Sequence, residues 1–125
     1  MADAIAKFKG TTQQNTADTF TVITIDGTDI ESIDQDYCVD AELYAVCYAT
    51  NNSYHGSASN TCQFGRIGSS NVFRNNGTVR KAGSTLDNIN LSFSGTDIYV
   101  DVTLASAGGA TIDVMAWAVL RIYKP

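Results

Sequence analysis

The sequence predicts an all-β fold, a single antiparallel β-sandwich of the jelly-roll type. Apolar and polar residues alternate strictly in several segments, which is the period of a strand with one buried face. Glycine occurs between those segments next to Asn, Asp, Ser or a second Gly, as tight turns require. The one proline is the last residue, and no segment shows the longer apolar repeat of a helix.

The first half of the chain begins with two short extended segments. Residues 5–9 and 20–25 have the composition of strands, and Asp26-Gly27 predicts a tight turn after the second. From Tyr37 to Ala49 the odd positions are mostly small and apolar. The even positions there include Asp40, Glu42, Tyr44 and Tyr48. This spacing predicts a long strand whose odd-numbered side chains face the core.

The middle of the chain is less regular. Residues 50–60 are polar and rich in Asn and Ser, which predicts a long surface loop. Short strands are expected at residues 62–67 and 71–74, and the pair Asn76-Gly77 predicts a hairpin turn between Phe73 and Val79.

Strict alternation returns in the last third of the chain. It predicts strands at residues 89–93, 98–104 and 111–123, with turns at residues 94–97 and 107–109. In the last of these strands the even-numbered side chains, from Ile112 to Ile122, are expected to fill the core.

The length and charge of the chain limit what it can be. With 125 residues and 44% hydrophobic residues, it matches one globular domain. We assign residues 1–15 to an N-terminal arm and residues 16–125 to the sandwich. The net charge is −5, and the eight Lys and Arg residues are scattered, so no basic surface for nucleic acid is expected.

The sequence has no feature of a membrane protein. The apolar run from Val114 to Leu120 is too short to cross a bilayer. The first nine residues lack the apolar core of a secretory signal. We therefore expect a soluble protein that folds in the cytoplasm and has no membrane partner.

The three cysteines are expected to be free thiols. An odd number does not form a complete disulfide framework. Cys38 and Cys47 lie on one predicted strand with an odd separation, so their side chains point to opposite faces and cannot bridge. Cys62 can reach one of them only if its strand is a neighbour.

The last predicted strand is unusual because its second face is also apolar. Its odd positions carry Met115, Trp117 and Val119 between charged residues. Either another part of the chain covers this face, or a second subunit or virion protein does. Aromatic and Met residues are typical of interface cores, which favours the second explanation. Tyr44 and Tyr48 on the other long strand extend the same predicted interface.

We expect no catalysis, no metal and no cofactor. The single histidine, His55, lies beside Tyr54 in the predicted loop, without a partner that orients it as a base. Tyr54 and His55 remain candidates for contacting a ligand, and the exposed tyrosines Tyr44, Tyr48 and Tyr99 are candidates for stacking on sugars.

Two groups of acidic residues leave alternatives open. The residues Asp26, Asp29, Glu31, Asp34 and Asp36 either bind calcium, without the EF-hand spacing, or belong to solvated turns. Asp40 and Glu42 share one strand face at a separation of about 7 Å, which loosely fits the two carboxylates of a glycosidase. No substrate-binding aromatic residue beyond Tyr44 can be assigned to that pair.

The order of these features resembles small structural domains in the virions of tailed bacteriophages. The resemblance extends from Thr16 to the end of the chain. It rests on the segments Phe64-Gly65-Arg66-Ile67, Phe73-Arg74-Asn75-Asn76-Gly77, Ile98 to Leu104, Gly108 to Ile112 and Ala116 to Ile122. Trp117 lies later than in the usual pattern of these domains. The resemblance implies a non-enzymatic virion protein that is oligomeric and often trimeric.

Two functions follow from this resemblance. The first is a capsid decoration or cement protein, a homotrimer that binds the major capsid protein and stabilises the shell. The alternative is a receptor- or carbohydrate-binding module of a tail fibre or spike. A small hydrolase is a third, distant hypothesis. In either of the first two cases the chain is located in the virion.

Overall fold

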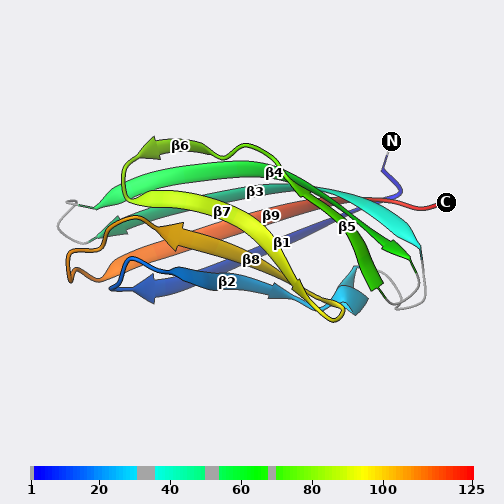
Figure 1. The fold of residues 1–125 in the computed structure, drawn as a ribbon, viewed down its shortest axis with the longest axis horizontal. Coiled ribbons are helices and arrows are strands. Elements are labelled where there is room, and N and C mark those ends of the chain that lie inside the picture. Colours follow the sequence, from blue (N-terminus) through cyan, green and yellow to red (C-terminus); the bar gives the residue numbers. More distant parts are fainter. Residues whose placement is uncertain (1, 31–35, 50–53, 68–69) are drawn as a thin grey trace.

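Two antiparallel sheets pack face to face in the computed structural model, which describes residues 2–30, 36–49, 54–67 and 70–125 (Figure 1). The larger sheet has the order β1-β9-β3-β4-β5, and β6 also pairs with β4. Its strands are β1 (Ala4–Gln14), β9 (Ile112–Tyr123), β3 (Tyr37–Ala49), β4 (His55–Ile67), β5 (Ser70–Asn76) and β6 (Arg80–Gly83). The smaller sheet has the order β2-β8-β7, with β2 (Thr19–Ile25), β8 (Asp97–Leu104) and β7 (Leu86–Ser94). The all-β sandwich expected from the sequence is confirmed.

The core lies between the sheets and is formed by the alternating positions. In β9 the even-numbered side chains from Ile112 to Ile122 are all buried, as predicted. The odd-numbered side chains of β3 and the even-numbered side chains of β8 meet them in one cluster. Each large apolar side chain buried there contributes about 1.5–3 kcal/mol. The alternation therefore identified the core faces of the long strands correctly.

The segment assigned to an N-terminal arm, residues 1–15, contributes a strand to this sheet. β1 pairs with β9 along its whole length, from Ala4 opposite Ile122 to Gln14 opposite Ile112. Ala6 and Phe8 on its inner face pack against the core. The strand expected at residues 5–9 is therefore longer at both ends and forms one edge of the larger sheet.

The prediction of a loop at residues 50–60 is wrong over its second half. Residues 50–53 lie outside the described residues, but β4 begins at His55. Its inner face is small and polar at this end, with Ala58 and Asn60 buried. The Asn60 side-chain amide donates to the Ile89 carbonyl at 2.9 Å. Because Asn is depleted in strands, the composition concealed this one.

The hairpin predicted at Asn76-Gly77 is also wrong. β5 and β6 do not pair with each other, since both pair with β4 along the same edge. Gly77 lies at the break between them, where its amide donates to the Thr61 carbonyl at 2.8 Å. A Cβ at Gly77 would lie 2.7 Å from that carbonyl oxygen. Glycine is needed here for a close approach to β4 and not for a turn.

The remaining glycine turns divide into two kinds. Gly95 joins β7 to β8 in a two-residue hairpin with a positive φ of 61°, and Gly108 and Gly109 also have positive φ, as expected. Asp26-Gly27 differs, because it opens a short 3-10 helix, Gly27–Asp29. The Asp26 carboxylate caps this helix by accepting from the Thr28 amide at 3.0 Å.

Candidate ligand-binding face

The outer face of the larger sheet carries most of the predicted site residues. We use "outer face" for the side chains of this sheet that point away from the smaller sheet. Trp117 is 38% exposed, and Tyr44 and Tyr48 are 43% and 44% exposed. Met115 and Val119 are half-buried beside them. Since β1 lies next to β9 and not over it, the first segment of the chain leaves Trp117 uncovered.

The strand register brings the aromatic residues together. Trp117 on β9 lies directly opposite Tyr44 on β3, and Met115 lies opposite Val46. Tyr48 lies opposite Asp113, two positions further along the same face. Side chains that oppose each other in antiparallel strands have Cβ atoms about 4.5–5.5 Å apart and make contact. Trp117, Met115, Tyr44, Val46 and Tyr48 therefore form one continuous patch.

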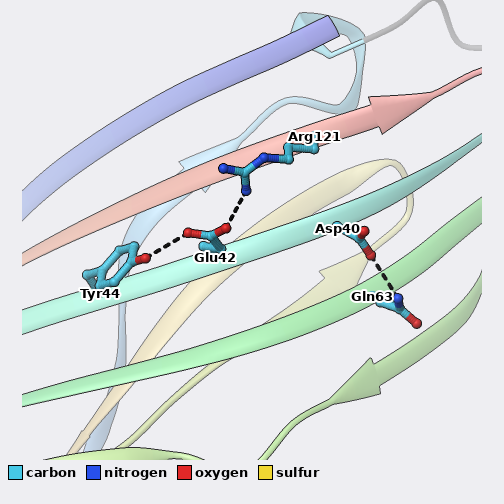
Figure 2. A network of polar contacts seen from close by, with 5 residues as sticks. All are labelled: Asp40, Glu42, Tyr44, Gln63 and Arg121. Atoms are coloured by element: carbon cyan, nitrogen blue, oxygen red, sulfur yellow. Dashed lines mark hydrogen bonds and ion pairs between the residues drawn. The ribbon is translucent and has the colours of Figure 1, made fainter. Parts of the chain in front are cut away.

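A polar network borders this patch (Figure 2). Glu42 on β3 accepts a hydrogen bond from the Tyr44 hydroxyl at 2.7 Å and forms an ion pair with Arg121 on β9. Two residues before Glu42 on the same face of β3, Asp40 accepts a hydrogen bond from the Gln63 side chain on β4 at 2.8 Å. These contacts connect three adjacent strands and hold Tyr44 beside the carboxylate.

The pKa of Glu42 is shifted in the direction opposite to that of a glycosidase acid. The hydrogen bond from Tyr44 is the largest cause that holds the pKa of Glu42 below its usual value of 4.5. Burial acts in the opposite direction, and the contacts with Arg121 lower the pKa further. The same hydrogen bond raises the pKa of Tyr44 above its usual value of 10.0. A general acid for glycoside cleavage needs a raised carboxyl pKa. Glu42 is suited to accept hydrogen bonds as an anion.

Shallow depressions lie on both sides of the patch. One of about 450 Å³ is lined by the residues of the polar network other than Tyr44, together with Thr61, Asn75 and Gly77. Another, of about 220 Å³, lies between Tyr44, Ser59 and Arg80. Across β9, depressions of about 410 Å³ and 400 Å³ adjoin Trp117 and Met115. The outer face is thus a broad, uneven surface of the kind that an extended ligand contacts.

The structure separates the two residues of the predicted ligand loop. His55 is exposed at the start of β4 and lies opposite Tyr48, so it belongs to one end of the outer face. Tyr54 is half-buried and packs against the core. Its hydroxyl fills the space beside Gly108, where an added Cβ would lie 1.8 Å from it. Tyr99 lies on β8 in the smaller sheet, whereas Tyr44 and Tyr48 lie on the larger one.

Several residues of this face were not singled out from the sequence. Lys7 and Lys9 on β1 lie opposite Val119 and Trp117. Arg80 on β6 lies opposite Ser59, which in turn lies opposite Tyr44. The alternation of Lys7 and Lys9 with Ala6 and Phe8, which pack against the core, is the sequence signal from which their outward direction follows. No comparable signal exists for Arg80.

The described residues contain no group of three or more His, Cys, Asp or Glu side chains that could hold a metal ion. Within the acidic segment from Asp26 to Asp36, Asp26 is used as a helix cap, while Glu31 and Asp34 lie outside the described residues. In the part of the chain that the structure describes, no helix has the length and hydropathy needed to cross a membrane.

Comparison with known proteins gives a likeness of fold. No protein-family model and no curated protein matches the sequence. Among solved structures, the tailspike protein of Acinetobacter baumannii phage AM24 superposes with a TM-score of 0.59 at 12% identity, over 97% of this chain and 26% of that one. The chain therefore spans about a quarter of the length of that tailspike.

Two further tailspikes match less well. The tailspike of Acinetobacter phage vB_ApiP_P1 gives a TM-score of 0.46 at 10% identity, over 97% of this chain and 22% of the tailspike. A tailspike of Acinetobacter baumannii bacteriophage Fri1, described as a capsular polysaccharide depolymerase, gives 0.28 at 8% identity, over 95% and 20%. At these identities the likeness concerns the fold alone.

Proposed function

We propose that this chain is a carbohydrate-binding β-sandwich module of a bacteriophage tail spike or fibre. It binds a polysaccharide of the host surface through the outer face of its larger sheet. The observation that carries this proposal is the pair Trp117 and Tyr44, which lie side by side and exposed on an open sheet face. The role is binding without catalysis.

The chemistry of the face suits a sugar. A pyranose ring has an apolar face that stacks on an aromatic ring, and hydroxyl groups at its edge that need hydrogen-bond partners. Trp117, Tyr44 and Tyr48 offer the rings. Glu42, held as an anion, and the Gln63 amide offer acceptors and donors next to them. A few oriented polar groups beside an aromatic surface give such a site its specificity.

The likeness to the AM24 tailspike supports a place in the phage tail. It covers 97% of this chain, so the whole sandwich corresponds to one part of a longer tailspike. The decoration of a capsid, which we placed first from the sequence, has no comparable support. Location in the virion is common to both functions.

The test is the binding of purified bacterial capsular polysaccharides by the chain and two variants. Trp117→Ala removes the central ring, and we expect a loss of affinity of about tenfold or more. Tyr99→Ala is the matched control, because it removes an aromatic ring from the smaller sheet. Binding by isothermal titration calorimetry should be unchanged in the control. Equal binding by both variants would contradict the proposal.

A second function of the same face is supported by its aliphatic residues. Val46, Met115 and Val119 are half-buried and adjoin Trp117, and such side chains favour contact with protein over contact with sugar. As the alternative role, we propose that the chain self-associates through this face in a homotrimer. If the chain decorates a capsid, its further partner is the major capsid protein. Sedimentation analysis tests it: Trp117→Ala should then dissociate an oligomer of the wild type. A wild-type protein that is monomeric and does not bind to capsids would exclude this role.

A further inference from the structure

One row of side chains crosses the larger sheet from edge to edge and has a cation at each end. In order across the strands, the row consists of Lys9, Trp117, Tyr44, Ser59 and Arg80. Adjacent strands lie about 4.8 Å apart, so the Cα atoms of Lys9 and Arg80 are about 19 Å apart. A ligand that lies across the strands and stacks on both rings therefore meets a positive charge at either end.

The outer face also differs in charge from the chain as a whole. Among the side chains that the structure describes, four basic and three acidic ones project from the strands of this face. The basic residues are Lys7, Lys9, Arg80 and Arg121, and the acidic residues are Asp40, Glu42 and Asp113. Since the chain carries a net charge of −5, this face is a local reversal of sign.

The contacts on this face leave the lysines available. Glu42 is engaged by Arg121 and Tyr44, Asp40 by Gln63, and Asp113 accepts from the Gln13 side chain at 2.7 Å. Among the described residues, no ion pair joins Lys7, Lys9 or Arg80 to a carboxylate. Their amine and guanidinium groups are therefore free to receive an anion from a ligand.

We infer that the polysaccharide bound by the outer face is acidic, and that Lys7 and Lys9 on one side and Arg80 on the other receive its carboxylates. This inference rests on the carbohydrate-binding function proposed above and names the class of its ligand. A carboxylate at the edge of a sugar ring stacked on Trp117 lies one strand from Lys9. An overall negative chain would repel a polyanion, so binding has to take place where the local charge is positive.

The experiment compares acidic polysaccharides with their neutral derivatives. The probes are polygalacturonate, alginate and polysialic acid, each beside the same polymer after chemical reduction of its carboxyl groups to alcohols. The double variant Lys7→Gln/Lys9→Gln and the single variant Arg80→Gln remove the proposed cations. Lys81→Gln is the matched control, because Lys81 is the neighbour of Arg80 on β6 and pairs with Asp87 at 3.1 Å.

We expect at least one acidic probe to bind, with about three- to tenfold lower affinity after carboxyl reduction and in the lysine and arginine variants. Lys81→Gln should bind like the wild type, and added salt should weaken binding. The inference is overturned if the reduced polymers bind as tightly as the acidic ones, or if Lys81→Gln loses as much affinity as Arg80→Gln. It is also overturned if single-stranded DNA binds more tightly than every polysaccharide.

The results separate this inference from the function on which it rests. Equal binding of acidic and reduced polymers, lost in Trp117→Ala, would support a carbohydrate-binding module and reject the acidic ligand. No difference between the wild type and Trp117→Ala with any polymer would reject the carbohydrate-binding function itself.

Discussion

Glu42 connects the acid–base behaviour of the molecule to its outer face. Its carboxylate is stabilised in the folded state by Tyr44 and then by Arg121, so its pKa is lower than in the unfolded chain. A group of this kind contributes stability that is fully present above its unfolded pKa, near 4.5, and that is lost as the pH falls through the lower folded value. The contribution is therefore intact at neutral pH and disappears in acid.

Glu42→Gln should reduce the dependence of thermal stability on pH below about 4.5, because the variant has no carboxylate to protonate. The same variant should bring the raised pKa of Tyr44 back towards 10.0, since the carboxylate that stabilises the neutral phenol is gone. Ultraviolet absorbance titration, with Tyr44→Phe as the reference for the other tyrosines, measures this pKa. An unchanged titration of Tyr44 would show that the hydrogen bond does not form in solution.

The three thiols should differ in reactivity. Cys38 is exposed, whereas Cys47 and Cys62 are buried, and burial raises the pKa of both to about 11. Since the thiolate is the reactive form, a disulfide reagent should modify one thiol in the native protein and three after unfolding without reductant. Fewer than three in the unfolded protein would show a disulfide. Cys38→Ser should remove the native reaction.

What sequence reasoning found at the scale of residues depended on alternation. It placed Trp117 and Tyr44 on outward faces and Ala116 in the core, because period two is fixed by the backbone. It did not find the contact of Glu42 with Arg121 or the row from Lys9 to Arg80. Those depend on which strands are neighbours and on their register, which a single strand does not encode.

At the scale of elements, one face of β9 is buried in the core and the other is partly exposed, so substitutions on the two faces should have different effects. Ala116→Asp should unfold the domain, because Ala116 is fully buried and an unpaired carboxylate there has no partner. Trp117→Ala, one residue further along the same strand, should leave the fold intact because that side chain is 38% exposed. Circular dichroism distinguishes the two. If Trp117→Ala unfolds the chain while Ala116→Asp does not, the faces are reversed.

Gly77 tests the break between β5 and β6. Gly77→Ala should destabilise the fold by about 1–3 kcal/mol, because the added methyl group meets the backbone oxygen of Thr61, which cannot move without disturbing β4. Gly95→Ala is a useful comparison, since nothing lies near its Cβ and its cost comes only from its positive φ. Chemical denaturation measures both. A neutral Gly77→Ala would place the close approach in doubt.

The elements that sequence reasoning missed have a physical explanation. The start of β4 is polar because its inner positions carry the small residue Ala58 and the hydrogen-bonded Asn60, so hydrophobicity gives no sign of a strand. The Asn76-Gly77 pair has the composition of a hairpin, but the chain continues along β4 on the same edge. Local composition indicates that glycine is needed at this position. It does not distinguish a hairpin turn from a close approach to a neighbouring strand.

At the scale of the molecule, the place of residues 1–15 can be tested by deletion. Removal of residues 1–14 takes away β1, exposes the edge of β9 and uncovers the core beside Phe8. We expect a lower melting temperature and self-association of the truncated chain, because an unpaired strand edge is a template for other chains. Size-exclusion chromatography and thermal denaturation measure these effects. Unchanged melting would support an arm that is dispensable for the sandwich.

The division of strands between sheets was also beyond the sequence. Tyr44, Tyr48 and Tyr99 all lie on alternating strands and look equivalent in composition, yet the first two lie on the larger sheet and Tyr99 on the smaller one. The order of strands in a sheet is set by contacts between residues far apart in the chain. The alternation of apolar and polar residues within one strand does not predict those contacts.

The pairing of β1 with β9 has a consequence for the synthesis of the protein. The two ends of the chain meet, with the Asp3 amide donating to the Ile122 carbonyl at 2.8 Å, and both termini lie at one end of the molecule (Figure 1). Within this sandwich, the strand that is synthesised first is therefore paired with the strand that is synthesised last. Pairing across so long a stretch of chain carries a large loop-closure entropy and forms slowly. Until β9 has been synthesised, Phe8 on β1 lacks the neighbouring strand beside which it is partly buried, and during that time it is exposed to chaperones and to other nascent chains.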